Sequence, residues 1–195
     1  FTEPRRVQLY GPPDAMSADP SKQTKVAISY LTNDSIDTDE TMAMSFLCSL
    51  LLDDFRGPFY KNIIDRGIAP DFAPGVGYSS SHRDTTFTVG FQGIKPESVP
   101  VVEQAIEQTF EMVARDGISD SLIQSAMHSF ELALKKKSPN FGVELCYPIV
   151  SNWIHSQDPS TVLQINRQLD ELKIKLADPD FLKNLTKKYF IGNQH

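Results

Sequence analysis

Apolar and polar residues alternate along two stretches of the chain, which is the period of a β-strand with one buried face. This pattern predicts strands at 25–31 and 84–92. A third strand is predicted at 71–80, and the polar turn 79–82 between it and the strand at 84–92 predicts an antiparallel hairpin. The alternating apolar positions of the first and last strands are Val26, Ile28, Tyr30, Phe87, Val89 and Phe91.

The remaining segments have apolar residues at intervals of three and four, the period of a helix with one buried face. We predict a long helix at 36–53, which Asp37 or Thr38 can cap, and a short helix at 59–65. From Pro96 onward the helical period continues to the end of the chain. The helices predicted there are 99–115, 122–137, 141–155, 160–176 and 181–190.

Local signals add three expectations about the helical run. Ser119 is placed to cap the helix at 122–137, and Pro148 is expected to interrupt the helix at 141–155. Cys48 and Cys146 both lie in apolar helical segments, so we expect two buried free thiols in a reducing compartment.

The order of elements is a strand, a helix pair, a hairpin and a helical run. Strands and helices do not alternate strictly, so the pattern favours an α+β fold over a doubly wound parallel sheet. We predict an antiparallel sheet with several helices packed on one face. The chain is expected to form a single domain over 1–195, with a connector at 1–23, strands and helix pair at 24–94, and the helical run at 95–195.

Composition narrows the possible partners. Nineteen Lys and Arg against twenty-five Asp and Glu give a formal charge of −6, which does not favour nucleic acid as a partner. No apolar run reaches the roughly 18–20 residues of a membrane-spanning helix, so no membrane partner is expected. The sequence begins Phe1-Thr2-Glu3-Pro4, without an initiator Met or a signal peptide, and we expect it to be a piece of a longer chain.

Local catalytic motifs are incomplete. A zinc peptidase helix of the inverted type carries His-x-x-Glu-His, because two imidazoles bind the metal and the glutamate activates its water. His128 and Glu131 match the first part, but the next residue is Leu132, so we interpret the pair as an exposed surface pair. Gly-x-Ser-x-Gly and phosphate-binding loops are absent. The residues alone therefore predict a soluble α+β domain without an active site of its own.

Several segments carry a family resemblance that runs nearly from end to end. The chain resembles the second, non-catalytic domain of the N-terminal half in the large mitochondrial members of the pitrilysin-type inverted zinc metallopeptidases. The segments that carry the resemblance are 44–52, 57–61, 67–72, 75–78 and 87–94.

The resemblance implies four related α+β domains, arranged as two halves that close around a chamber. In such proteins the zinc site lies in the first domain, and an Arg and a Tyr of the last domain hold substrate and transition state. Ile64 and Pro70 stand at the positions that match this Arg and Tyr. The resemblance thus implies no catalytic and no metal-binding residue in this chain, zinc bound by another domain of the same polypeptide, peptide substrates, and location in the mitochondrial matrix.

On this basis the predicted role is a structural, chamber-forming domain of a zinc endopeptidase that degrades targeting presequences and other short unstructured peptides. By strand alternation Ser29, Thr86 and Thr88 point away from the helices and are candidates for lining the chamber. They could equally face solvent or a neighbouring domain. The alternative function is a free-standing peptide-binding or assembly module, similar to inactive core subunits. In either case, exposed apolar patches are expected where other domains are missing.

Overall fold

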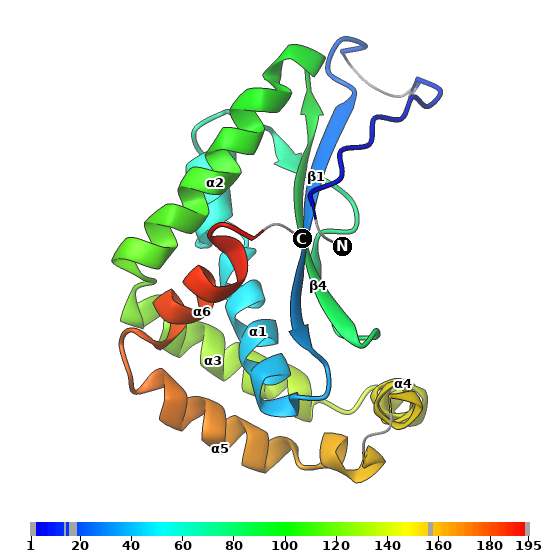
Figure 1. Ribbon diagram of the computed structural model, residues 1–195, viewed down its shortest axis with the longest axis vertical. Helices are drawn as coiled ribbons and strands as arrows, with labels where there is room; N and C mark the ends of the chain where they lie inside the picture. The colour runs from blue at the N-terminus through cyan, green and yellow to red at the C-terminus, as the bar shows by residue number, and fades with distance from the viewer. Residues whose placement is uncertain (1–2, 14, 16–18, 156–157, 194–195) are drawn as a thin grey trace.

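An antiparallel sheet of four strands forms the centre of the computed structural model, which describes residues 3–13, 15, 19–155 and 158–193 (Figure 1). The strands run in the order β1-β4-β2, and β3 also pairs with β4. The strands are β1 (Thr24–Asp34), β2 (Asp71–Phe72), β3 (Gly77–Ser79) and β4 (Asp84–Ile94). The two long strands, β1 and β4, determine the plane of the sheet.

The register of β1 against β4 brings the alternating apolar residues to one face. Tyr30 lies opposite Phe87, and Ile28 lies opposite Val89. The predictions for these two strands are confirmed, and both strands extend beyond their predicted ends. The prediction of one strand at 71–80 is wrong, since two short strands flank a turn. Pro74 has no backbone N–H to donate to a hydrogen bond between strands, and Gly75 has a φ of 82°. The chain therefore turns between β2 and β3.

The first helix, α1 (Thr38–Leu51), lies between the sheet on one side and α3 and α5 on the other. The side chain of Asp37 caps it by accepting a hydrogen bond from the Glu40 backbone N–H at 2.9 Å, as predicted. The predicted short helix follows as the π-helical turn η1 (Tyr60–Ile64). Seven residues of α1 are buried: Ala43, Met44, Phe46, Leu47, Cys48, Leu50 and Leu51.

The C-terminal half is helical, as predicted, with three differences. Ser119 occupies the N-cap position of α3, but its side chain makes no capping hydrogen bond. The α4 helix continues through Pro148 instead of being interrupted, and the predicted helix at 160–176 is divided at Gln164 into a 3-10 turn and a helix. The elements are η2 (Pro96–Ser98), α2 (Val99–Asp116), α3 (Asp120–Lys135), α4 (Phe141–Ile154), η3 (Pro159–Leu163), α5 (Ile165–Leu176) and α6 (Phe181–Phe190).

Most helices cover one face of the sheet, which confirms the predicted α+β architecture. Figure 1 shows α1, α2, α3, α5 and α6 on this side, whereas α4 lies beyond the lower end of β1 and β4, towards the other side. The N-terminal segment runs beside β1, and Arg6 forms an ion pair of 2.8 Å with Glu103 of α2.

Aromatic rings fill the space between the sheet and the helices. Phe110 of α2 is central, with its ring centroid 4.4 Å from that of Phe190 and 5.4 Å from that of Tyr30. The rings of Phe59 and Phe87 also contact it, at 5.1 Å and 6.3 Å. The sheet, η1, α2 and α6 are therefore joined through one aromatic cluster.

A buried hydrogen-bond network joins the other end of the sheet to α1. Asn33 is 4% exposed, and its amide donates to the Thr41 hydroxyl at 2.8 Å and to the Asp34 carbonyl at 3.1 Å. The hydroxyl of Tyr78 donates to the Asn33 side-chain oxygen at 2.8 Å. Since both amide hydrogens are bonded, Asn33 of the sequon Asn33-Asp34-Ser35 is not available to carry a glycan in the folded chain.

Burial makes the folded chain sensitive to alkaline pH. Desolvation raises the pKa of the Tyr78 phenol from 10.0 to about 12, and desolvation with the charge of Glu107 raises the pKa of Tyr30 to about 12. The stability from these neutral phenols is fully present below pH 10 and is lost as the pH rises from 10 to about 12. Alkaline titration followed by tyrosinate absorbance should show one fewer late-ionising group in the Tyr78→Phe chain. An unchanged late phase would contradict the burial of this phenol.

Candidate functional surface

The face of the sheet opposite the helices carries the three residues predicted to line a chamber. We call it the open face. Ser29 is exposed and Thr86 and Thr88 are half-buried, and the structure brings all three together. Ser29 lies opposite Thr88 in the β1–β4 register, and their hydroxyl oxygens are 2.8 Å apart. The residues of β1 and β4 that alternate to this face are Lys25, Ala27, Ser29, Leu31, Thr86, Thr88, Gly90 and Gln92.

The open face is polar and its centre is flat. The Gln92 amide donates to the Asp71 carboxylate of β2 at 3.1 Å, which extends the polar surface across the sheet. Gly90 lies directly opposite Ala27, and a Cβ at this glycine would lie only 2.7 Å from the Cβ of Ala27. Hydroxyl and amide groups on a flat surface can exchange hydrogen bonds with an extended backbone, because each hydroxyl both donates and accepts.

The residues of the incomplete zinc motif have structural contacts of their own. The Glu131 carboxylate accepts hydrogen bonds from Lys135 at 2.6 Å and from Lys173 of α5 at 2.9 Å. These two lysines lower the pKa of Glu131 to about 2, and His128 is exposed. Within the described residues, no group of three or more His, Cys, Asp or Glu side chains could hold a metal ion. This part of the chain does not fit zinc, and Glu131 instead links α3 to α5.

The positions that match the catalytic Arg and Tyr of the resemblance lie at the end of η1. Ile64 is half-buried and packs against the core, whereas Pro70 is exposed just before β2. Neither side chain has a hydrogen-bond donor, and proline also lacks a backbone N–H. This segment therefore offers no side-chain group that could stabilise a developing oxyanion.

The helix α4 presents an exposed apolar surface, whose position the sequence did not predict. The expectation of a buried Cys146 is wrong, because none of the residues of α4 is buried. Cys48, in contrast, is buried as predicted, and its burial raises the pKa of its thiol. The signal that could have identified this surface is the composition of α4, whose single charged residue is Glu144. We call the following residues the α4 surface: Phe141, Val143, Tyr147, Val150, Trp153 and Ile154.

The α4 surface is not a membrane-spanning segment. No helix in the described part of the chain is both long enough and apolar enough to cross a bilayer. An exposed apolar patch, which the sequence led us to expect, is present on α4, a helix of fourteen residues.

Comparison with protein families identifies the fold. A family model described as "Peptidase M16 inactive domain" matches residues 2–130. The chain belongs to this M16 peptidase family. The family model that matches is that of the inactive type of M16 domain.

Curated proteins similar to this chain include presequence proteases, which confirms the resemblance stated from the sequence. The mitochondrial presequence protease of Schizosaccharomyces pombe is 37% identical over 100% of this chain, which covers 20% of that protein. The mitochondrial presequence protease of Mus musculus is 38% identical over 100% of this chain, which covers 19% of it. The M16 domain therefore spans about a fifth of the length of these relatives.

Solved structures show the same fold at lower identity. The inactive peptidase domain of a putative zinc protease from Bordetella parapertussis superimposes with a TM-score of 0.69 at 17% identity, and the match covers 87% of each chain. The periplasmic protease PqqL from Escherichia coli gives a TM-score of 0.60 at 16% identity, over 89% of this chain and 18% of that protein. These matches establish the fold of the M16 domain.

Proposed function

We propose that this chain is a structural, chamber-forming domain of a mitochondrial zinc endopeptidase that degrades targeting presequences and other short unstructured peptides. The observation that carries the proposal is the match of the whole chain to about a fifth of each presequence protease, within a domain of the inactive type. The lack of catalytic groups at Ile64 and Pro70 is consistent with this role. Zinc and the groups of the reaction would come from other domains of the same polypeptide, in the mitochondrial matrix.

In this proposal the open face forms part of the wall of the peptide chamber. The helices cover the other face of the sheet, so the open face is the side on which a second domain or a substrate can lie (Figure 1). Ser29 and Thr88 bond to each other at 2.8 Å and can exchange this bond for one to a peptide backbone. Contacts of this kind do not depend on the peptide's side chains, which suits substrates of varied sequence.

The experiment introduces large side chains on the open face of the full-length enzyme. We expect the double variant Thr86→Trp/Thr88→Trp to lower kcat/KM several-fold for presequence-length peptides, because two indoles would occupy the space along the chamber wall. Turnover of a very short fluorogenic peptide that does not reach this wall should change less. Zinc content, measured by atomic absorption, should be unchanged because no residue of this chain is proposed to bind the metal.

A matched control separates a chamber effect from a general one. Gln104 is exposed on α2, on the helix-covered side of the molecule, so Gln104→Trp should leave peptide turnover unchanged. The assignment of the open face to the chamber would be contradicted if the Thr86/Thr88 variant had normal thermal stability and unchanged kinetics for presequence-length peptides.

A further inference from the structure

The α4 helix is folded, yet this chain provides it with little packing. Its contacts are chiefly with η3, where the Asn152 amide donates to the Thr161 hydroxyl at 3.3 Å. The Ile36 backbone N–H and then Arg83 lower the pKa of the Asp34 carboxyl of β1, and His155, just after α4, adds the smallest effect in the same direction. The helix is thus attached at one end and exposed along most of its length.

The sequence of α4 is unsuited to a helix that stands alone. Pro148 lies in its interior and removes one main-chain hydrogen bond, and Gly142 lies in its first turn. Isolated helices shorter than about 12–15 residues are marginal in water even with favourable residues, so a helix such as α4 depends on tertiary packing. None of its residues is buried within this chain, so the contact with η3 leaves most of α4 without stabilising tertiary packing.

The exposed apolar residues of α4 form one broad face of the helix. Tyr147, Trp153 and Ile154 are 71%, 69% and 67% exposed, and Val143 and Val150 are 58% and 49% exposed. A contiguous exposed apolar face of this kind marks a site of contact with another protein or with a membrane. A helix lying on a lipid surface needs a basic polar face, and α4 has no Lys or Arg. The composition of α4 therefore favours a contact with protein.

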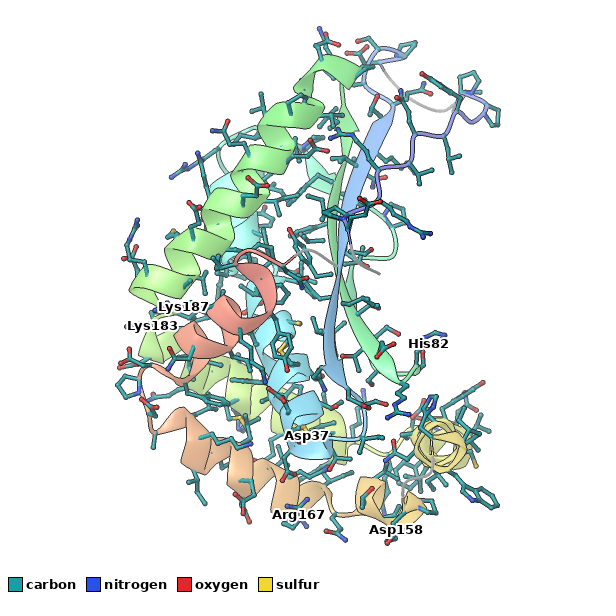
Figure 2. All side chains as sticks on the ribbon, in the orientation of Figure 1. Asp37, His82, Asp158, Arg167, Lys183 and Lys187 are labelled. Atoms are coloured by element: carbon teal, nitrogen blue, oxygen red, sulfur yellow. The ribbon has the colours of Figure 1, made fainter. Side chains whose placement is uncertain are left out.

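The position of α4 indicates where its partner lies. Figure 2 shows α4 between the hairpin turn that carries His82 and the start of η3 at Asp158, beyond the end of the sheet and towards the open face. The helices that form the core lie on the opposite side (Figure 1). The α4 helix and the open face thus lie on the side of the sheet away from the core helices.

We propose that the α4 surface packs against another folded domain of the same polypeptide, through apolar side chains on that domain. This inference rests on the proposed function, because it requires that the chain is one domain of a longer enzyme. Most of the length of the presequence-protease relatives lies outside the part that matches, so the polypeptide can supply such a domain. A peptide substrate is present for part of the time, whereas α4 requires packing whenever the protein is folded.

Cys146 provides a native probe of this contact. In the full-length enzyme without substrate, we expect a maleimide to label Cys146 at least tenfold more slowly than a cysteine introduced by Ile174→Cys on α5. Ile174 is 68% exposed, close to the 69% of Trp153, and serves as the reference for an uncovered helix. Site-resolved labelling is read by mass spectrometry after digestion, and both sites should react at equal rates in denaturant.

A pair of charge substitutions tests the contact itself. Trp153→Asp should raise the labelling rate of Cys146 towards that of the reference cysteine, because a carboxylate is costly to bury in an apolar interface. Ile174→Asp, at matched exposure, should leave it unchanged. Fast labelling of Cys146 in the unaltered full-length enzyme overturns the proposal.

The other possible occupants give different results. Labelling that becomes slow only when peptide substrate is added would show that substrate covers α4, and labelling that becomes fast on dilution would show that a second copy covers it; either result overturns the proposal. Slow labelling together with unchanged kinetics of the Thr86/Thr88 variant would reject the chamber role and retain the α4 contact. Fast labelling of Cys146 together with altered kinetics of the Thr86/Thr88 variant would reject the α4 contact and retain the chamber role.

Discussion

Replacement of Phe110 by alanine is expected to lower the free energy of unfolding of this chain by about 3–5 kcal/mol, the range for truncating a buried phenylalanine. Phe110 is 1% exposed and lies where the sheet, η1, α2 and α6 meet. Its ring contacts those of Phe190 at 4.4 Å and Phe59 at 5.1 Å, so the cavity would be lined by rings that cannot easily close it. Urea denaturation followed by circular dichroism measures the loss.

The control for this prediction lies on the same helix. Val101 is 53% exposed on α2, and Val101→Ala should change the free energy of unfolding by no more than about 0.5 kcal/mol. A loss below about 1 kcal/mol for Phe110→Ala would show that the aromatic cluster repacks, or that it contributes less than its burial indicates.

The sequence was sufficient for the two long strands because their burial has a strict period. Phe87 lies between Thr86 and Thr88, and Tyr30 continues the alternation of Val26 and Ile28, so the direction of both rings towards the helices follows from the chain itself. Ser29 and Thr88 were placed on the open face by the same argument. Their 2.8 Å hydroxyl contact could not be predicted, because it depends on the register between β1 and β4.

Tertiary packing limited the other predictions. The apolar pattern at 141–155 correctly predicted a helix, but it could not show that the side chains of α4 are left exposed by the described part of this chain. Burial of Cys146 was inferred from the apolar helical segment around it, and such a segment does not show whether its residues pack within this chain. The segment 71–80 is divided into β2 and β3 by the turn at Gly75, and the apolar pattern of the segment did not indicate this turn.

Replacement of Asn33 by leucine is expected to be the largest single-residue loss outside the aromatic core. The Asn33 side chain accepts from Tyr78 at 2.8 Å and donates to Thr41 at 2.8 Å, and leucine can do neither. The hydroxyl of Thr85 also lies 2.9 Å from the Asn33 side-chain oxygen. An unsatisfied buried polar group costs about 1–3 kcal/mol, so Asn33→Leu should lower the free energy of unfolding by about 2–4 kcal/mol.

Comparing the stability losses of Asn33→Leu and Tyr78→Phe distinguishes the cost of an unsatisfied buried polar group from that of a lost hydrogen bond. Phenylalanine removes the phenolic hydroxyl together with its need for a partner, so Tyr78→Phe should cost only about 0.5–1.5 kcal/mol. In the double variant the Tyr78 hydroxyl, which Asn33→Leu would leave without an acceptor, has been removed. The double variant should therefore lose less unfolding free energy than the sum of the losses of the two single variants. Additive losses in urea denaturation, or equal losses for the two single variants, would contradict a network centred on Asn33. The expected non-additivity follows from the geometry, because the Asn33 side chain of β1 bonds both the Tyr78 hydroxyl of β3 and the Thr41 hydroxyl of α1.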